Sequence, residues 1–486
     1  MNVKLNSPRS PESPALNYRI IIGGVLLAAI ALILTLFSSR FDYSIPVAEK
    51  PIFLLILILM ISGAVYLMVV HYLLQIVNTK VLIPVLTIGL IMRVVFLFST
   101  PILEADYYRY LWDGAVSAHG INPYRFSPAE VLAGESNPDL PLALQNLADE
   151  SGTIIGRINH PQLRTIYPPV SQLFFTIAHF ISPWSISGWR LVLLLTDLLN
   201  LFFLFHLLKY LNFSPLFLIV YWWNPLLVKE IFNSGHMDIL IFPFVLGAIY
   251  FSAKKRAFLS VSLLALAMGV KLWPILLLPL LLRPFFPQWK KILSAFLLFG
   301  GVCGVIFLPQ ILTGLDRSSG LFAYTKSWEN NDSFFVLLGW LWQIILPVFK
   351  IHPGYAQLAA RLTTAGIMGI LIIFLTLRTK ADLPSLLKNC LIVISALFLI
   401  SPTQFPWYFV WLLPFLTIVP NMPLLLFTLL LPLYYLNFYF EQKGLITVFN
   451  NGIVWLEFVP VWLLLLWQWI KSHRDCSIIL KPAETE

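Results

Sequence analysis

Two acidic residues stand two positions apart in the stretch Glu104-Ala105-Asp106, directly after an apolar run. If the chain is helical from Asp106 onward, Arg109 and Asp113 share a face with Asp106, because residues three or four positions apart are neighbours on a helix. A carboxylate held beside a guanidinium could act as a general base that removes a proton from a hydroxyl group. A solvated helix with local ion pairs fits the same spacing, so this segment alone leaves both interpretations open.

A second polar group, His236 and Asp238, lies in Gly235-His236-Met237-Asp238 between two later apolar runs. Both side chains are costly to place at the mouth of an apolar segment without a partner. They could bind sugar hydroxyls, orient an acceptor, or hold a divalent metal if Asp106 or Asp113 supplied a further ligand. The alternative is a polar turn that satisfies its own hydrogen bonds.

Lys271 interrupts a 26-residue apolar run at 257–282, together with Gly269 and Pro274. A buried charge beside a proline predicts two short helices that meet near Lys271. A lysine there is a point-charge partner for a phosphate, and Arg93, near the end of its own apolar run, is a second candidate. The alternative for Lys271 is snorkelling to lipid headgroups.

Aromatic and amide side chains occur together in two further segments, 328–332 and 402–408, the second of which holds Gln404, Trp407 and Tyr408. This combination suits a sugar, because pyranose faces stack on aromatic rings while amides bind hydroxyl groups. An aromatic belt at the membrane interface has the same composition and needs no ligand.

The amino-acid composition narrows the class of protein to which these candidate residues can belong. Of the 486 residues, 59% are hydrophobic and 11% are charged, whereas soluble domains have roughly 45–50% apolar and about 25% charged residues. This rules out a soluble enzyme, a disordered chain and a nucleic-acid-binding module. The net charge of +9 comes from scattered basic residues, and the three cysteines are too far apart to suggest a disulfide framework or a metal cluster.

The chain is therefore predicted to be an all-α, polytopic integral membrane protein with about 13–14 transmembrane helices, at about 20 apolar residues each. The apolar runs lie at about 20–37, 52–74, 81–98, 189–208, 214–233, 237–253, 257–282, 292–313, 356–377, 388–402, 406–419, 421–440 and 453–470. Two shorter aromatic segments, 168–184 and 333–349, are predicted to be re-entrant or interfacial helices.

The basic clusters fall in loops on one side of this topology, which the positive-inside rule assigns to the cytoplasm. We therefore expect cytoplasmic tails at 1–19 and 471–486 and a single membrane domain at 20–470. Within it, residues 99–187 form the one long loop, which is predicted to be extracytoplasmic and folded. Most acidic residues fall on the same outer side.

The order of the motifs resembles the membrane-embedded GT-C glycosyltransferases, and among them the polyprenyl- or dolichyl-phosphate-mannose-dependent mannosyltransferases. The likeness extends from about residue 100 to 420 and rests on an ordered set of motifs. After the Glu104-x-Asp106 pair these are RYLWDG, GINPY, IYPPV, NPLLVKE, GHMD, KLWP and PTQFPWY. Three predicted spans precede the long loop, where many members of the superfamily have one.

This resemblance implies a hexosyltransferase that moves a sugar, expected to be mannose, from a polyprenyl-phosphate donor to a lipid or glycan acceptor. The reaction would be an inverting displacement on the extracytoplasmic face of the plasma or inner membrane. A carboxylate of the first large outer loop would be the base, which gives Asp106 here, and Glu104 is the second candidate because related families often have Asp-x-Asp.

The other candidate residues follow from the same scheme. The donor phosphate would be bound by Lys271, Arg109 and Arg93, and the sugar or the acceptor by Asp113, His236, Asp238, Gln404, Trp407 and Tyr408. No cofactor is implied with certainty, and a divalent metal stays open. Two other classes remain as alternatives: a transporter or flippase of lipid-linked sugars, and a non-catalytic subunit of an envelope-assembly complex.

Overall fold

The computed structural model describes residues 14–73, 81–134, 140–314, 316 and 318–479. Over these residues the chain is helical without strands, and extended segments pair only at two isolated bridges, Arg164 with Ser319 and Asn330 with Thr403. The predicted all-α class is confirmed. The expected tails lie largely outside the described residues, although α1 begins at Pro14 and α25 ends at Ile479.

Eight helical segments among the described residues are long and apolar enough to cross a membrane, or nine if one bent pair counts as a span. They confirm a multi-pass membrane protein. The eight segments are Tyr18–Phe41, Ile52–Leu73, Ile186–Tyr210, Trp289–Ile311, Pro353–Arg378, Leu383–Ile400, Met422–Gln442 and Ile446–Lys471. They contain α1 (Pro14–Phe37), α2 (Ile52–Leu73), α8 (Ile186–Tyr210), α14 (Trp289–Ile311), α17 (Ala356–Arg378), α18 (Leu383–Ile400), α21 (Met422–Leu425), α22 (Phe427–Leu430), α23 (Leu436–Gln442), α24 (Ile446–Val448) and α25 (Val454–Ile479).

The remaining apolar runs form helices shorter than the runs suggest, because prolines, glycines and polar residues interrupt them. These are Leu82–Phe96, Pro169–Ile181, Ala257–Val270, Trp273–Phe285, Phe334–Val348 and Pro406–Ile418. The runs at 214–233 and 237–253, counted as two spans, meet in a bent pair, Pro225–Asn233 and Asp238–Ala253, with an angle of 103°. The expected 13–14 spans thus become eight or nine full-length spans plus short helices.

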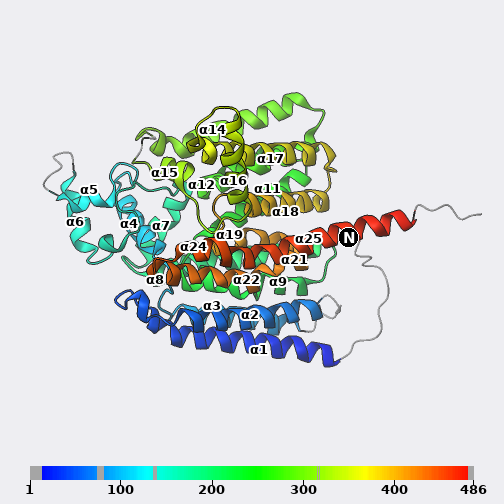
Figure 1. Cartoon of the computed structure of the whole chain (residues 1–486), viewed down its shortest axis with the longest axis horizontal. Helices are drawn as coiled ribbons and strands as arrows, with labels where there is room; N and C mark the ends of the chain where they lie inside the picture. Colours follow the sequence, from blue (N-terminus) through cyan, green and yellow to red (C-terminus); the bar gives the residue numbers. More distant parts are fainter. Residues whose placement is uncertain (1–13, 74–80, 135–139, 315, 317, 480–486) are drawn as a thin grey trace, which may run out of the picture.

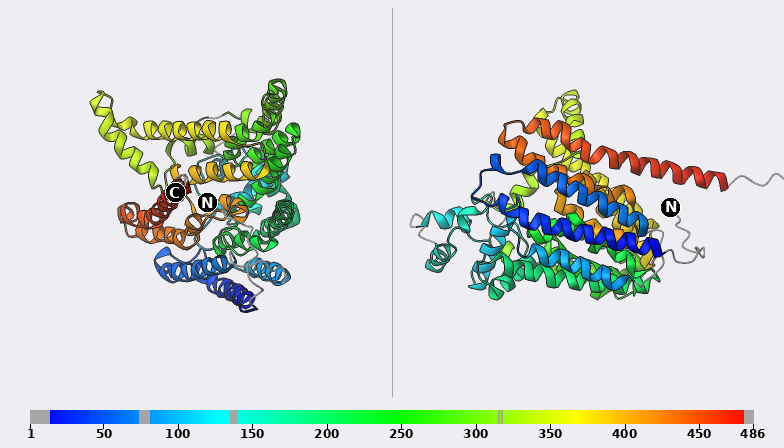
Figure 2. Two further views of the ribbon diagram at one scale, coloured as in Figure 1. Left: turned by 90° about the vertical axis from the view of Figure 1, so that its right-hand side faces the viewer. Right: turned by 90° about the horizontal axis from the view of Figure 1, so that it is seen from below.

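The long helices run side by side, and the segment 99–187 lies at one end of the bundle (Figures 1 and 2). The start of α1 and the end of α25 lie at the opposite end. Both described ends of the chain are therefore on one side of the bundle and the long segment is on the other, as the sequence predicted for a chain with both ends on one side of the membrane.

The described residues of the segment 99–187 are folded, as expected, and hold four α-helices: α4 (Asp106–Ala118), α5 (Pro128–Leu132), α6 (Leu142–Glu150) and α7 (Pro169–Ile181). Asp106 stands in the first turn of α4, where a carboxylate is stabilised by the helix dipole. The helix α4 packs along α7, and Gly114 permits the close approach, because a Cβ there would overlap the carbonyl group of Phe175.

A fully buried ion pair ties three helices together beneath this segment. Arg93 on α3 (Leu82–Phe96) places Nε 2.5 Å from Oδ2 of Asp197 on α8, and its NH1 donates to the carbonyls of Gly89 and Trp222. The guanidinium also lies 3.4 Å from the ring centroid of Trp222, on α9 (Ile219–Trp222). Arg93 is thus committed to the core and does not line the cavity described below, which corrects its assignment to a donor phosphate.

Replacing Arg93 with Met should lower stability by about 3–5 kcal/mol, because Asp197 would keep a buried charge without its partner. Thermal unfolding of the purified protein measures the change. The double variant Arg93→Met/Asp197→Leu should recover part of the loss. A double variant less stable than the single one would contradict the pairing.

Replacing Gly114 with Ala should also lower the Tm, because the added methyl group forces α4 and α7 apart; overpacking costs typically about 1–3 kcal/mol. The matched control is Gly301→Ala in α14, where a Cβ meets nothing within 4 Å. Equal Tm values for the two variants would show that α4 and α7 do not pack this closely.

Candidate active site

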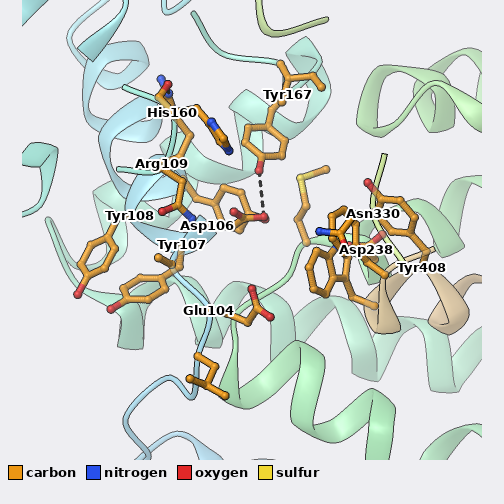
Figure 3. A pocket seen from close by; sticks show the side chains of 18 of the residues that line it. Glu104, Asp106, Tyr107, Tyr108, Arg109, His160, Tyr167, Asp238, Asn330 and Tyr408 are labelled. Carbon is orange, nitrogen blue, oxygen red and sulfur yellow. Dashed lines mark hydrogen bonds between the residues drawn. The ribbon is translucent and has the colours of Figure 1, made fainter. Parts of the chain in front are cut away.

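A cavity of about 1060 Å³ lies where the segment 99–187 meets the bundle. Its walls come from distant parts of the chain: 41–50, 100–110, 159–168, 237–238, 270–273, 320–330, 405–411 and 434–441. Pockets for ligands of drug size are about 300–1,000 Å³, so this cavity has room for more than one sugar. Figure 3 shows it from close by.

The two sequence-predicted carboxylates both line the cavity, and they differ in access. The side chain of Asp106 is 31% exposed and that of Glu104 is 9% exposed. The Tyr167 hydroxyl points toward Asp106 and lies 3.5 Å from its Oδ2 (Figure 3), while Glu104 is more buried. Asp106 is therefore the carboxylate that a molecule in the cavity meets first.

Burial raises the pKa of both carboxyl groups, since even the exposed part of Asp106 faces the cavity and not bulk solvent. The Lys229 ammonium partly offsets this effect on the pKa of Glu104, and the Lys271 ammonium partly offsets it on that of Asp106. A carboxylate with a raised pKa holds a proton more readily, and so is a better general base near neutral pH.

Lys271 occupies the predicted helix break. The helix α12 (Ala257–Val270) ends before it, Lys271 is extended, and η8 (Trp273–Leu277) begins two residues later. Its Nζ lies 2.5 Å from Oδ1 of Asp238, which also accepts from Nε1 of Trp411 at 2.5 Å. The ammonium stands over the ring of Tyr408 at 4.3 Å, and the Lys271 side chain is 21% exposed. The structure thus brings together Lys271, Asp238 and Tyr408, all of which line the cavity.

His236 takes a different place from the one expected. It is buried at the bend between η6 (Lys229–Asn233) and η7 (Asp238–Ile241), and it does not line the cavity. Its ring stacks on Trp407 at 3.9 Å between centroids, and Trp407 itself lines the cavity. Its nitrogens lie 3.9 Å from Asp106 Oδ2 and 4.0 Å from Glu104 Oε2. His236 therefore lies next to the two carboxylates on their side away from the cavity, and it does not form part of a sugar-binding wall.

Arg109 lines the cavity, but its NH2 donates to the carbonyls of His160 and Leu163, at 3.2 and 3.1 Å. It thus joins α4 to the segment 159–168. Its position still allows the predicted contact with a phosphate, because a guanidinium has five N–H donors.

Asp113 and Gln404 are buried and do not line the cavity, which corrects their assignment to a sugar. Asp113 accepts from Thr165 Oγ1 at 2.5 Å and from Gln172 Nε2 at 3.1 Å, so it fixes α4 against the chain that leads into α7. Gln404 donates to the carbonyls of Leu399 and Ser401. Both residues therefore hold neighbouring segments of the protein together.

Sequence reasoning did not single out Tyr167, which approaches Asp106, because the following Pro168-Pro169 pair reads as a turn before α7. Asn330 and Trp328, from the segment suspected for its amides and aromatic rings, do line the cavity. The bridge between Asn330 and Thr403 holds that segment beside 402–408. The proximity of these two segments is not visible in the sequence.

The metal hypothesis gains no support from the described residues, among which no group of three or more His, Cys, Asp or Glu side chains is arranged to hold an ion. Asp113 is committed to Thr165 and Gln172, so it is not the further ligand that His236 and Asp238 would need.

Comparison with protein families identifies residues 18–284 as the N-terminal domain of the alpha-(1->6)-mannopyranosyltransferase family. Searches of curated proteins and of solved structures returned no match. The matched range is more than half of the chain and includes Glu104, Asp106, Asp238 and Lys271. The chain therefore belongs to the alpha-(1->6)-mannopyranosyltransferase family and is a multi-pass membrane mannosyltransferase.

Proposed function

We propose that the protein transfers mannose from a polyprenyl-phosphate-mannose donor to a hydroxyl group of a lipid or glycan acceptor, with Asp106 as the base. The observation that carries this proposal is the position of Asp106: an accessible carboxylate in a large cavity, in front of Glu104 and within the electrostatic reach of Lys271. The family match favours an α-(1→6) linkage.

The reaction is a single displacement. The acceptor oxygen forms a bond to the anomeric carbon while its proton passes to Asp106. The bond from the anomeric carbon to the phosphate oxygen breaks, and the polyprenyl phosphate leaves with the electron pair. Because the oxygen enters opposite the leaving group, the anomeric configuration inverts. Glu104, more deeply buried, is the second candidate for the base.

Cations on the cavity wall would stabilise the charge that develops on the leaving phosphate. Lys271 uses one of its three N–H donors on Asp238, and because its side chain lines the cavity, the others would reach phosphate oxygens there. Arg109 is the second cation of this kind. The rings of Trp407, Tyr408 and Trp328 and the amide of Asn330 would bind the sugar.

The sidedness of the reaction is part of the proposal. Lys254, Lys255 and Arg256 directly precede α12, and the other end of α12 reaches the cavity at Lys271. Basic loops stay on the cytoplasmic side, so the cavity would face the extracytoplasmic side. A plasma or inner membrane location accords with this orientation.

Asp106→Asn should lower kcat by about 100-fold or more, because a general base typically contributes about 10²–10⁴-fold, whereas Glu104→Gln should retain measurable transfer. The assay uses purified protein, labelled polyprenyl-phosphate-mannose and a mannoside acceptor. Asp382→Asn is the control, since Asp382 caps α18 far from the cavity and Asn is an equivalent cap.

Near-normal transfer by both Asp106→Asn and Glu104→Gln would show that neither carboxylate is the base. Donor that crosses a vesicle membrane without being consumed would instead establish the flippase alternative, which no feature of the described structure favours.

Burial raises the pKa of Asp106. As the pH is lowered, the parent protein should therefore lose transfer activity at a higher pH than it would if its base were an aspartate with an ordinary pKa.

Lys271→Met/Asp238→Asn should raise the KM for the donor by about 10- to 100-fold, because a hydrogen bond to a charged group is worth about 1.5–3 kcal/mol. The double variant avoids leaving Asp238 as a buried charge without its partner. Asp238→Asn alone, which keeps the ammonium, is the control. An unchanged donor KM in the double variant would place the phosphate elsewhere.

A further inference from the structure

The imidazole of His236 lies among three carboxylates. Its Nδ1 is 3.9 Å from Asp106 Oδ2, and its Nε2 is 4.0 Å from Glu104 Oε2 and 3.6 Å from Glu230 Oε2. The ring is 1% exposed, and neither nitrogen has a hydrogen-bond partner among the described residues. A buried polar group without a partner costs about 1–3 kcal/mol, so this arrangement is not explained by stability.

The ring is held so that it cannot turn away from the carboxylates. The His236 backbone N–H donates to the Glu230 carbonyl at 3.1 Å. Gly235 has φ +81°, and its carbonyl accepts from Trp189 Nε1 at 2.7 Å. The ring lies flat on Trp407, with 14° between the planes. The two nitrogens therefore keep their directions, with Nδ1 toward Asp106 and Nε2 toward the two glutamates.

Glu230 is itself fixed on the far side of His236. Its Oε1 accepts from the Tyr435 hydroxyl at 2.5 Å and lies 3.5 Å from Lys229 Nζ, which leaves Oε2 facing the imidazole. Glu230 Oε2 is a further buried atom without a hydrogen-bond partner. A continuous row of polar groups thus runs from Tyr435 through Glu230 and His236 to Asp106.

We propose that His236 is a positioning residue: Nδ1–H donates to the Asp106 carboxylate, and Nε2 accepts a hydrogen bond from the carboxylic acid form of Glu230 or Glu104. Distances just beyond a hydrogen bond are typical of catalytic groups without substrate, which tighten when it binds. The inference rests on the proposed role of Asp106 as the base. It assigns Glu230 to orienting His236.

The sign of the effect on Asp106 follows from the donor. A hydrogen bond given to the charged form of a carboxyl group favours that form. Without the Nδ1 donor, Asp106 would be protonated at a higher pH, and its lone pair would be less well directed at the acceptor. Glu104, Asp106 and Glu230 lie within 4.0 Å of the His236 nitrogens, Trp407 stacks on its ring, and the ammonium groups of Lys229 and Lys271 act on it through their charge. Behind these, Asp238 is paired with Lys271, Tyr435 donates to Glu230, and Tyr434 packs against Trp407.

Two conservative variants separate the two nitrogens, because an asparagine amide occupies the place of Nδ1 and a glutamine amide that of Nε2. His236→Asn should keep kcat within about threefold of the parent. His236→Gln should lower kcat by about 10- to 100-fold, the scale of a misplaced catalytic group. It should also move the acid limb of kcat/KM upward by about one pH unit, with the donor KM unchanged.

His206→Asn is the matched control, since His206 is exposed on α8 and its Nδ1 lies 2.9 Å from the Phe202 carbonyl of the same helix; it should behave as the parent. The proposal would be overturned if His236→Asn and His236→Gln lowered kcat equally and left the acid limb of kcat/KM where it is in the parent. It would also be overturned if His236→Asn lowered kcat more than His236→Gln. If both variants fail to fold, Glu230→Gln decides. Its amide can still donate to Nε2, so a parent-like acid limb supports the proposal and an upward shift overturns it.

Failure of this inference differs from failure of the proposed function. If Asp106→Asn is inactive while both His236 variants keep the pH profile of the parent, only the role of His236 is wrong. If Asp106→Asn stays active, the base assignment itself is wrong.

Discussion

The structure depends on how charge is accommodated where an apolar helix bundle meets a folded loop. Taking an ion out of water costs several kcal/mol unless a partner compensates. Lys229 lies against Glu230 and Tyr435, Lys271 is paired with Asp238, and both pairs are fixed at interruptions of helices. Among the described residues, no lysine or arginine forms an ion pair with Glu104 or Asp106, so these two carboxylates of the cavity are the ones suited to accept a proton.

Interrupted helices bring these groups to one place. The bend of 103° after Asn233 places His236 beside the carboxylates and Asp238 beside Lys271, and the break in the helix at Lys271 places its side chain at the cavity. Irregular backbone at membrane depth is tolerated where it is buried in protein or lines a cavity. The same interruptions that reduce the number of full-length spans therefore build the site.

The cavity needs both halves of the chain. The range matched by the family, 18–284, supplies the two candidate bases, the bend and Lys271. Further wall residues come from beyond it: Trp328, Asn330, Trp407, Tyr408 and Tyr434. Trp407 also stacks on His236, so the second half of the chain contacts the groups beside the candidate bases as well.

The sequence by itself determined the membrane class and the break at Lys271, because apolar runs and proline act locally, and the resemblance of its motifs to a known family indicated the candidate bases. A helix from Asp106 was only a condition of the argument from spacing, and the structure supplied it. It could not determine which charged residues are buried partners. Arg93, Asp113 and Gln404 have the same side chains as ligand-binding residues, and only contacts with Asp197, Thr165 and Leu399 show that they hold the fold. Likewise, His236 stands behind the carboxylates, and not in the cavity, because segments up to about two hundred residues apart pack around it. Tertiary structure decided these roles, since a polar group's function depends on which partner has already satisfied it.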